Sequence, residues 1–164
     1  MKFIMLLALV ACHKKDPLSP TAVQTSEPEP VKPFTNTELA AITALSPRDP
    51  EPNCTEIGKT LSDPVGSFAH IAERVPMPPW VGIRACACLV DHAAEPAAEA
   101  TLSRWVTSEA WAGLALTAIN LLDKMPEDVA ARIAAAALDG PIADRAHADI
   151  AASSHEKVRA LVHE

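Results

Sequence analysis

This 164-residue chain has little positive charge and no long apolar run. A transmembrane helix needs about 20 consecutive apolar residues, whereas the apolar run that opens the chain, from Phe3 to Val10, ends in polar sequence soon afterwards. Fourteen Lys and Arg stand against 21 Asp and Glu, for a net charge of −7. An acidic protein lacks the electrostatic footprint of nucleic-acid binding and gains nothing from anionic lipid headgroups. We therefore expect no nucleic-acid partner.

Motifs of known catalytic chemistry are also missing. The sequence has no nucleophile-elbow GxSxG, no HExxH and no glycine-rich phosphate loop. We predict that the protein is not an enzyme, and we predict no cofactor, metal or small-molecule substrate. Gly82 and Gly113 fall at predicted helix or turn positions, and Gly140, which precedes a proline, is predicted to cap a helix C-terminus.

What the N-terminus does contain is a pattern that predicts an export signal. Lys2 precedes the apolar run, which closes on Leu9-Val10-Ala11-Cys12. A basic start, a short apolar segment and small residues before a cut site are typical of a secretory signal. With Cys directly after the small residue, the stretch resembles the lipobox of bacterial lipoproteins. The resemblance implies that residues 1–11 are removed and that Cys12, the new first residue, carries the lipid (palmitate). His13, where an Asp would favour the inner membrane, favours the outer membrane.

Residues 12–34 predict a tether between the lipid and a folded domain. Prolines interrupt a polar run in this segment, at Pro17, Pro20, Pro28, Pro30 and Pro33. Such a sequence cannot bury enough apolar area to fold. A proline-rich chain extends by about 3.1 Å per residue, so some twenty residues reach roughly 60 Å.

Helix signals begin at Thr35, and we predict an all-α domain over residues 35–164. Thr35 and Glu38 have the spacing of a capping box, followed by a short helix to about Leu45. Residues 53–61 predict a turn or a further short helix.

Further helix starts lie along the rest of the domain. Asp63-Pro64 combines a capping side chain with a proline at the first helical position, and predicts a helix through Glu73. Pro96 and Pro126, which are 30 residues apart, each predict another start. Ser153, with Glu156 three residues later, predicts the cap of the last helix.

A pattern recurs at a spacing of 30 and then 31 residues. The aligned segments are VGIRACACL (81–89), WAGLALTAI (111–119) and IADRAHADI (142–150). A period near 30 with two helices per period indicates an α-solenoid, because one helical hairpin cannot bury its apolar face alone. The pattern resembles short bacterial HEAT-like repeats over residues 63–164. A compact orthogonal helical bundle is the alternative fold.

Three cysteines fall within the predicted domain, and export would place them in an oxidising compartment. Cys54 is predicted to pair with Cys86 or with Cys88, and one thiol is then left over. A bond between Cys86 and Cys88 is disfavoured, because residues two apart on a helix point about 200° apart. Alternatively, all three are small core residues. The Cys86-x-Cys88 pair also has possible soft-metal ligands nearby in sequence, namely His70, Met77 and His92.

The remaining large and charged side chains are given ordinary structural roles. Trp111 is predicted to be in the core, and Trp80 to be half exposed. Arg84, Arg145 and Arg159 are predicted to form surface ion pairs with Asp91, Asp144 and Glu156. His147, His155 and His163 are predicted to face solvent.

These features together predict a membrane-anchored envelope lipoprotein that binds or scaffolds another envelope protein, since HEAT-like solenoids typically bind proteins along one face. The alternative function is a thiol- or metal-handling envelope protein that uses Cys54, Cys86 and Cys88.

Overall fold

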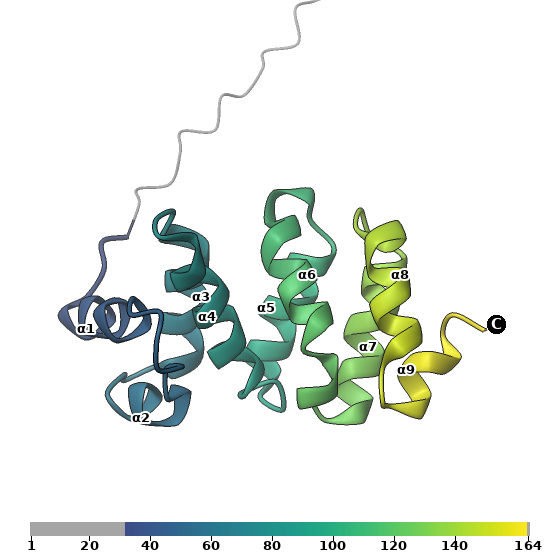
Figure 1. Cartoon of the computed structure of the whole chain (residues 1–164), viewed down its shortest axis with the longest axis horizontal. Coiled ribbons are helices and arrows are strands. Elements are labelled where there is room, and N and C mark those ends of the chain that lie inside the picture. Colours follow the sequence, from purple (N-terminus) through teal and green to yellow (C-terminus); the bar gives the residue numbers. More distant parts are fainter. Residues whose placement is uncertain (1–31, 164) are drawn as a thin grey trace, which may run out of the picture. The chain divides into compact units, whose positions relative to one another are not determined.

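The computed structural model describes residues 32–163, and all regular structure within them is helical (Figure 1). The helices are α1 (Asn36–Leu45), α2 (Cys54–Lys59), α3 (Pro64–Arg74), α4 (Pro79–Val90), α5 (Pro96–Val106), η1 (Glu109–Trp111), α6 (Ala112–Asn120), η2 (Leu122–Lys124), α7 (Glu127–Leu138), α8 (Ala143–Ala152) and α9 (Glu156–Ala160). The predicted all-α class is confirmed for this part of the chain. The predicted signal at 1–11, the predicted lipid site at Cys12 and nearly all of the predicted tether at 12–34 lie outside the described residues.

The helices of residues 33–163 contact one another in two rows. In one row α4 contacts α6, and α6 contacts α8; in the other row α3, α5, α7 and α9 contact each other in that order. Within the hairpins α3 contacts α4, α5 contacts α6 and α7 contacts α8. Figure 1 shows this succession, with the colours running in sequence order from α1 to α9. No helix in the described residues is both long enough and apolar enough to cross a membrane.

The core lies between the two rows, and the aligned positions of the repeat contribute to it. Small residues that let the helices approach closely are fully buried at Ala85, Ala115 and Ala146. The branched residues four positions later are also buried: Leu89, Ile119 and Ile150. Burial of a large aliphatic side chain stabilises a fold by roughly 1.5–3 kcal/mol, so these positions contribute to the stability of the core.

Tryptophan positions differ from the predictions in one case. Trp111 was expected in the core, but it is half-buried, because the 3-10 turn η1 holds it ahead of α6 rather than within it. The fully buried tryptophan is Trp105 of α5, whose Nε1 donates to a Glu73 carboxylate oxygen over 2.8 Å. Trp80 is half-buried, as predicted.

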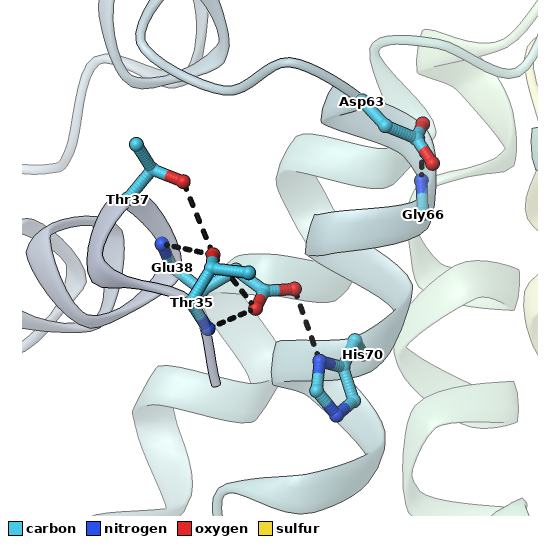
Figure 2. A network of polar contacts seen from close by, with 6 residues as sticks. All are labelled: Thr35, Thr37, Glu38, Asp63, Gly66 and His70. Carbon is cyan, nitrogen blue, oxygen red and sulfur yellow. Dashed lines mark hydrogen bonds and ion pairs between the residues drawn. The ribbon is translucent and has the colours of Figure 1, made fainter. Parts of the chain in front are cut away.

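Local capping signals fix several helix starts. The Thr35 hydroxyl accepts from the Glu38 amide over 3.2 Å, and the Glu38 carboxylate accepts from the Thr35 amide over 2.7 Å, which confirms the predicted capping box (Figure 2). Asp63 accepts from the Gly66 amide over 2.9 Å at the start of α3. The predicted cap by Ser153 is wrong.

The last helix starts later than that prediction placed it. The N-cap of α9 is His155, which makes no side-chain capping bond. The Ser153 hydroxyl donates instead to the carboxylate of Asp123, 30 residues earlier, and the Ser154 amide donates to the same carboxylate. The Ser153 oxygen also accepts from the His155 amide over 3.2 Å, not from the Glu156 amide that the predicted capping box requires.

Helix α1 is joined to α3 by a buried polar contact. Glu38 is only 3% exposed, and its second carboxylate oxygen lies 3.0 Å from Nδ1 of His70 on α3 (Figure 2). The Phe34 ring packs on the His70 ring at 4.7 Å between centroids. Burial raises the pKa of Glu38, but the hydrogen bonds from Thr35 and His70 outweigh it, so the net pKa is lowered.

Gly140 follows the C-cap of α7, as predicted, but for a different reason. No glycine of the described residues has a positive φ, so the left-handed cap geometry is absent here. A Cβ on Gly140 would instead lie 2.6 Å from the carbonyl oxygen of Val106 and 3.1 Å from that of Ala136. Only glycine lets α5 and the end of α7 approach this closely.

Candidate functional site

A groove lies along the contact between α4 and α6. It consists of two hollows of about 600 Å³ and about 550 Å³ that share Ile83 in their lining. The larger hollow lies toward the C-terminal ends of α4 and α6, and the smaller lies toward their N-terminal ends. We call the two hollows together the α4–α6 groove.

Helical spacing brings the groove residues to one side of each helix. On α4, Ile83, Ala87 and Asp91 follow at intervals of four, which places them on one face. On α6 and the following turn, Thr117, Asn120, Leu121 and Lys124 follow at intervals of three and four. One face of α4 and one face of α6 thus line the groove.

One end of the groove is open and mainly apolar, although Glu73 and Arg74 also belong to its lining. Ile83 is 48% exposed, although it is a large aliphatic residue in the middle of a contacting helix. Trp111 and Leu114 are half-buried in the same hollow, and Val75 from the end of α3 contributes to it. A Cβ built on Gly113 would meet no atom within 4 Å, so this end has room for an additional side chain.

The other end is polar and carries unpaired charges. Glu51, Asp91 and Lys124 line it, and none of the three makes an ion pair within the part of the chain that the structure describes. The side-chain amides of Asn53 and Asn120 lie in the same lining. Both α4 and α6 end here, so the negative ends of two helix dipoles lie at this end of the groove.

The loop of residues 46–53, which contributes Glu51, Pro52 and Asn53 to the wall of the groove, is held by side chains of α4. The Arg84 guanidinium donates to the main-chain carbonyls of Leu45 (2.9 Å), Pro47 and Arg48. Trp80 Nε1 donates to the Ser46 carbonyl over 2.8 Å, and the Arg48 guanidinium lies 4.8 Å from the centroid of the Trp80 ring. The predicted ion pair of Arg84 with Asp91 is therefore wrong, because main-chain carbonyls take the guanidinium instead.

A disulfide fixes the same wall from the other side. Cys54, at the start of α2, is bonded to Cys88 of α4, which is one of the two predicted pairings. Cys86 is free and buried; its thiol lies 3.6 Å from the Leu114 carbonyl, and burial raises its pKa to about 12. A thiol with so high a pKa is a poor nucleophile and a poor metal ligand.

The soft-metal set that the sequence suggested is not brought together. His70 contacts Glu38, His92 contacts Glu95, and Met77 is 73% exposed in the turn before α4. Within residues 32–163 no three His, Cys, Asp or Glu side chains are grouped so that they could hold a metal ion.

The remaining charged residues are placed as follows. Arg145 is exposed and makes no ion pair in the described residues, and Arg159 donates to the carbonyls of Ser153 and Ser154 over 2.7 Å, so both predicted acidic pairings are wrong. His147 and His163 are exposed as predicted. His155 is not, since its Nε2 lies 3.0 Å from the Met125 carbonyl.

Comparisons with protein-family models, with curated proteins and with solved structures found no match. Function is therefore inferred from the α4–α6 groove itself, which sequence reasoning did not single out. One signal for it was present: Ile83 stands at a repeat position that Gly113 and Asp144 occupy in the other two copies. Glycine and aspartate at the equivalent positions indicate an exposed site. A large apolar residue at that site is therefore expected to be exposed.

The chemistry of the groove suits binding. Cys54 is in a disulfide, and the Thr117 hydroxyl donates to the Gly113 carbonyl over 3.0 Å, so these two lining residues offer no free nucleophile. What the groove offers is an apolar surface with room beside it, amide groups that can donate and accept, and charges of both signs.

Proposed function

We propose that this chain is an exported lipoprotein, anchored in the bacterial cell envelope by lipid on Cys12, that binds another envelope protein through its α4–α6 groove. Residues 12–34 act as the tether, and the helical domain is the binding module. The lipobox-like stretch supports the anchor, and the outer membrane is the favoured destination because His13 follows the cysteine.

We further propose that residues 63–163 form a short HEAT-like solenoid. Two features support this fold over the orthogonal bundle. Helices of each row contact the next helix of the same row, in sequence order. The buried residues also recur at the aligned positions, as Ala85, Ala115 and Ala146 illustrate. Stacked hairpins of this kind present a continuous face that is suited to protein binding.

The observation that carries the binding function is the apolar end of the groove. Ile83 is nearly half exposed beside the half-buried Trp111 and the open space at Gly113. A hollow lined by an exposed aliphatic residue and a tryptophan supports binding, because tryptophan is enriched among the residues that dominate protein interfaces. The polar end supplies the rim that such interfaces also have.

Blocking the groove tests the binding function. The intact protein is affinity-purified from chemically crosslinked cell envelopes, in parallel with Gly113→Trp and Ala100→Trp. Trp at Gly113 fills open space in the groove, whereas Ala100 is exposed on α5, in the other row. We expect a dominant partner that Gly113→Trp loses and Ala100→Trp retains. Equal recovery by both variants would exclude the groove as the binding site.

Removing the lipid site tests the anchor separately. Cys12→Ala should move the protein from the membrane fraction to the soluble fraction, because more than one acyl chain on a single residue is what makes such anchoring stable. Gly113→Trp should stay in the membrane fraction. Continued membrane association of Cys12→Ala would contradict the anchor and leave the groove hypothesis untouched.

The second candidate, thiol or metal handling, has less support. The Cys54–Cys88 disulfide occupies two of its three thiols, and Cys86 is buried. It would require metal to bind in stoichiometric amount and to be lost in Cys88→Ser, which elemental analysis of the purified protein measures directly.

A further inference from the structure

We infer that the α4–α6 groove takes an extended segment of its partner that carries a large apolar residue and, three or four residues away, a Lys or Arg. The apolar residue lies beside Ile83 and Trp111, and the basic residue lies between Glu51 and Asp91. This inference rests on the proposed binding function and adds the chemistry of the bound segment.

The spacing follows from the length of the groove. Ile83 and Asp91 are eight residues apart on one helical face, which corresponds to about 12 Å at 1.5 Å per residue. An extended chain covers about 3.3 Å per residue, so three to four residues bridge that length. A side chain at each end of such a segment reaches both ends of the groove.

The apolar end favours an apolar side chain, because a polar side chain placed there would lose its hydrogen bonds to water without replacing them. Ile83, Trp111 and Leu114 present carbon atoms to the hollow, and the space at Gly113 is free of neighbours within 4 Å of a built Cβ. A large aliphatic or aromatic side chain removes this surface from water at about 25 cal/mol for each Å² of apolar area.

Charge decides the other end. Glu51 and Asp91 are carboxylates without ion-pair partners in the described residues, and the carbonyl ends of α4 and α6 add negative potential. Lys124 is the one ammonium group in the lining. Arg84 keeps its positive charge, but its N–H groups point at the carbonyls of residues 45–48, and it makes no ion pair with Asp91 in the described residues. The two carboxylates are therefore available to a cation from a partner. The chain's net charge of −7 also steers basic partners toward it.

An extended segment suits the polar groups better than a helix does. The Asn120 side-chain amide can both donate and accept hydrogen bonds, whereas Asn53 offers its NH2 group as a donor, because its Oδ1 accepts from the Glu56 amide over 3.1 Å as the N-cap of α2. An extended backbone has free N–H and C=O groups to pair with them, whereas a helix satisfies its own.

Site-specific photocrosslinking in cells tests the proposed function and this inference at once. A photoreactive phenylalanine derivative replaces either Gly113 in the apolar end or Thr117 on α6 in the polar end. Ala100 on α5 is the control position. The crosslinked partner peptide is identified by mass spectrometry. We expect a partner at the two groove positions and none at Ala100, with a crosslinked segment that has a basic residue three or four positions from an aliphatic or aromatic one.

The possible outcomes separate the two ideas. A groove-specific protein whose crosslinked segment lacks the basic residue overturns the inference and leaves the binding function standing. No groove-specific protein, or lipid alone, overturns both.

A binding assay with synthetic peptides then tests the charge. The full chain in mild detergent is titrated with fluorescein-labelled GSLSTSKSG or GSLSTSESG, which differ only in the charge of one residue. We expect the lysine peptide to bind at least fivefold more tightly, and the order to reverse in the double variant Glu51→Lys, Asp91→Lys. Equal binding of the two peptides, or an order that the double variant does not change, would overturn the inference.

Discussion

Arg84 of α4 donates a 2.9 Å hydrogen bond to the main-chain carbonyl of Leu45, the last residue of α1. The last carbonyls of a helix have no partner within it, and a cation there is favoured by the helix dipole. The same guanidinium reaches the next loop at Pro47 and Arg48. One side chain thus closes a helix and holds a wall of the α4–α6 groove.

Removal of this guanidinium should destabilise the domain. Hydrogen bonds to charged groups contribute roughly 1.5–3 kcal/mol each when desolvated, and Arg84 is half-buried, so we expect Arg84→Ala to lower the free energy of unfolding by about 2 kcal/mol. Arg145→Ala is the matched control, because Arg145 stands at the same repeat position but is exposed. Chemical denaturation followed by circular dichroism measures both. Equal losses in the two variants would contradict the role given to Arg84.

Two glycines should respond in opposite ways to alanine. Gly140→Ala places a methyl group against the Val106 carbonyl, and we expect it to cost about 1–3 kcal/mol of stability, as overpacking does. Gly113→Ala meets no atom, so its stability should be unchanged or higher by up to about 1 kcal/mol. Thermal unfolding of the two variants compares them directly, and a tolerated Gly140→Ala would refute the close approach of α5 and α7.

Glu38 makes stability depend on pH in the acidic range. Because its pKa is lowered in the folded state, its contribution is present above the unfolded pKa near 4.5 and is lost as pH falls through the folded value. Glu38→Gln should therefore be less stable than the parent by about 1–2 kcal/mol near neutral pH, and the gap should close in acid. Glu56→Gln, which alters an exposed pair with Lys59, is the control. A gap that persists at the lowest pH would point to packing alone.

Thiol reactivity should distinguish Cys86 from the disulfide pair. In a Cys12→Ala chain, we expect no reaction with a thiol reagent when folded and one thiol per chain after denaturation without reductant, because Cys54 and Cys88 are bonded. After reduction and denaturation, all three should react. Three reactive thiols before reduction would show that the bond is absent.

The raised pKa of Cys86 also has a consequence in base. A thiol with a folded pKa of about 12 stabilises the fold fully below the ordinary value of 9.0 and loses that contribution as pH rises above it. By pH 10.5 the loss relative to Cys86→Ala should approach about 2 kcal/mol, at about 1.4 kcal/mol for each pH unit. Denaturation curves over this pH range measure the difference. Parallel behaviour of the two proteins would show that the thiol is accessible to water.

Local signals in the sequence predicted most of the helices. The capping box of Thr35 and Glu38, the cap at Asp63 and the proline at Pro96 depend on residues within one turn, and each helix begins where its signal stands or one residue later. Of the aligned alanines, Ala85, Ala115 and Ala146 are buried, whereas Ala87 is half-buried and Ala148 is exposed. These features involve short sequence separations or strict spacing, so a single sequence contains them.

The site was not predictable in the same way. Arg84 was assigned to a nearby aspartate, but its acceptors are main-chain carbonyls 36 to 39 residues away, and a carbonyl leaves no trace in the sequence. The spacing of Ser153 predicts a local cap, but its hydroxyl donates to Asp123, which lies 30 residues away along the chain. The groove arises from the distance between two packed helices, which spacing within either helix does not reveal.

If the domain is anchored through its N-terminal side, as proposed, the Cys54–Cys88 bond has a mechanical consequence. The two Cα atoms lie 5.1 Å apart, although 34 residues separate them along the chain. If that loop were pulled straight, it would span about 115 Å at roughly 3.4 Å per residue. Because the bond holds the two ends of this loop together, a pulling force cannot extend the loop. Force applied from the N-terminal side can therefore peel away α1 and the loop of residues 46–53, but it bypasses α2, α3 and most of α4, which carries Ile83 and Ala87 of the groove lining.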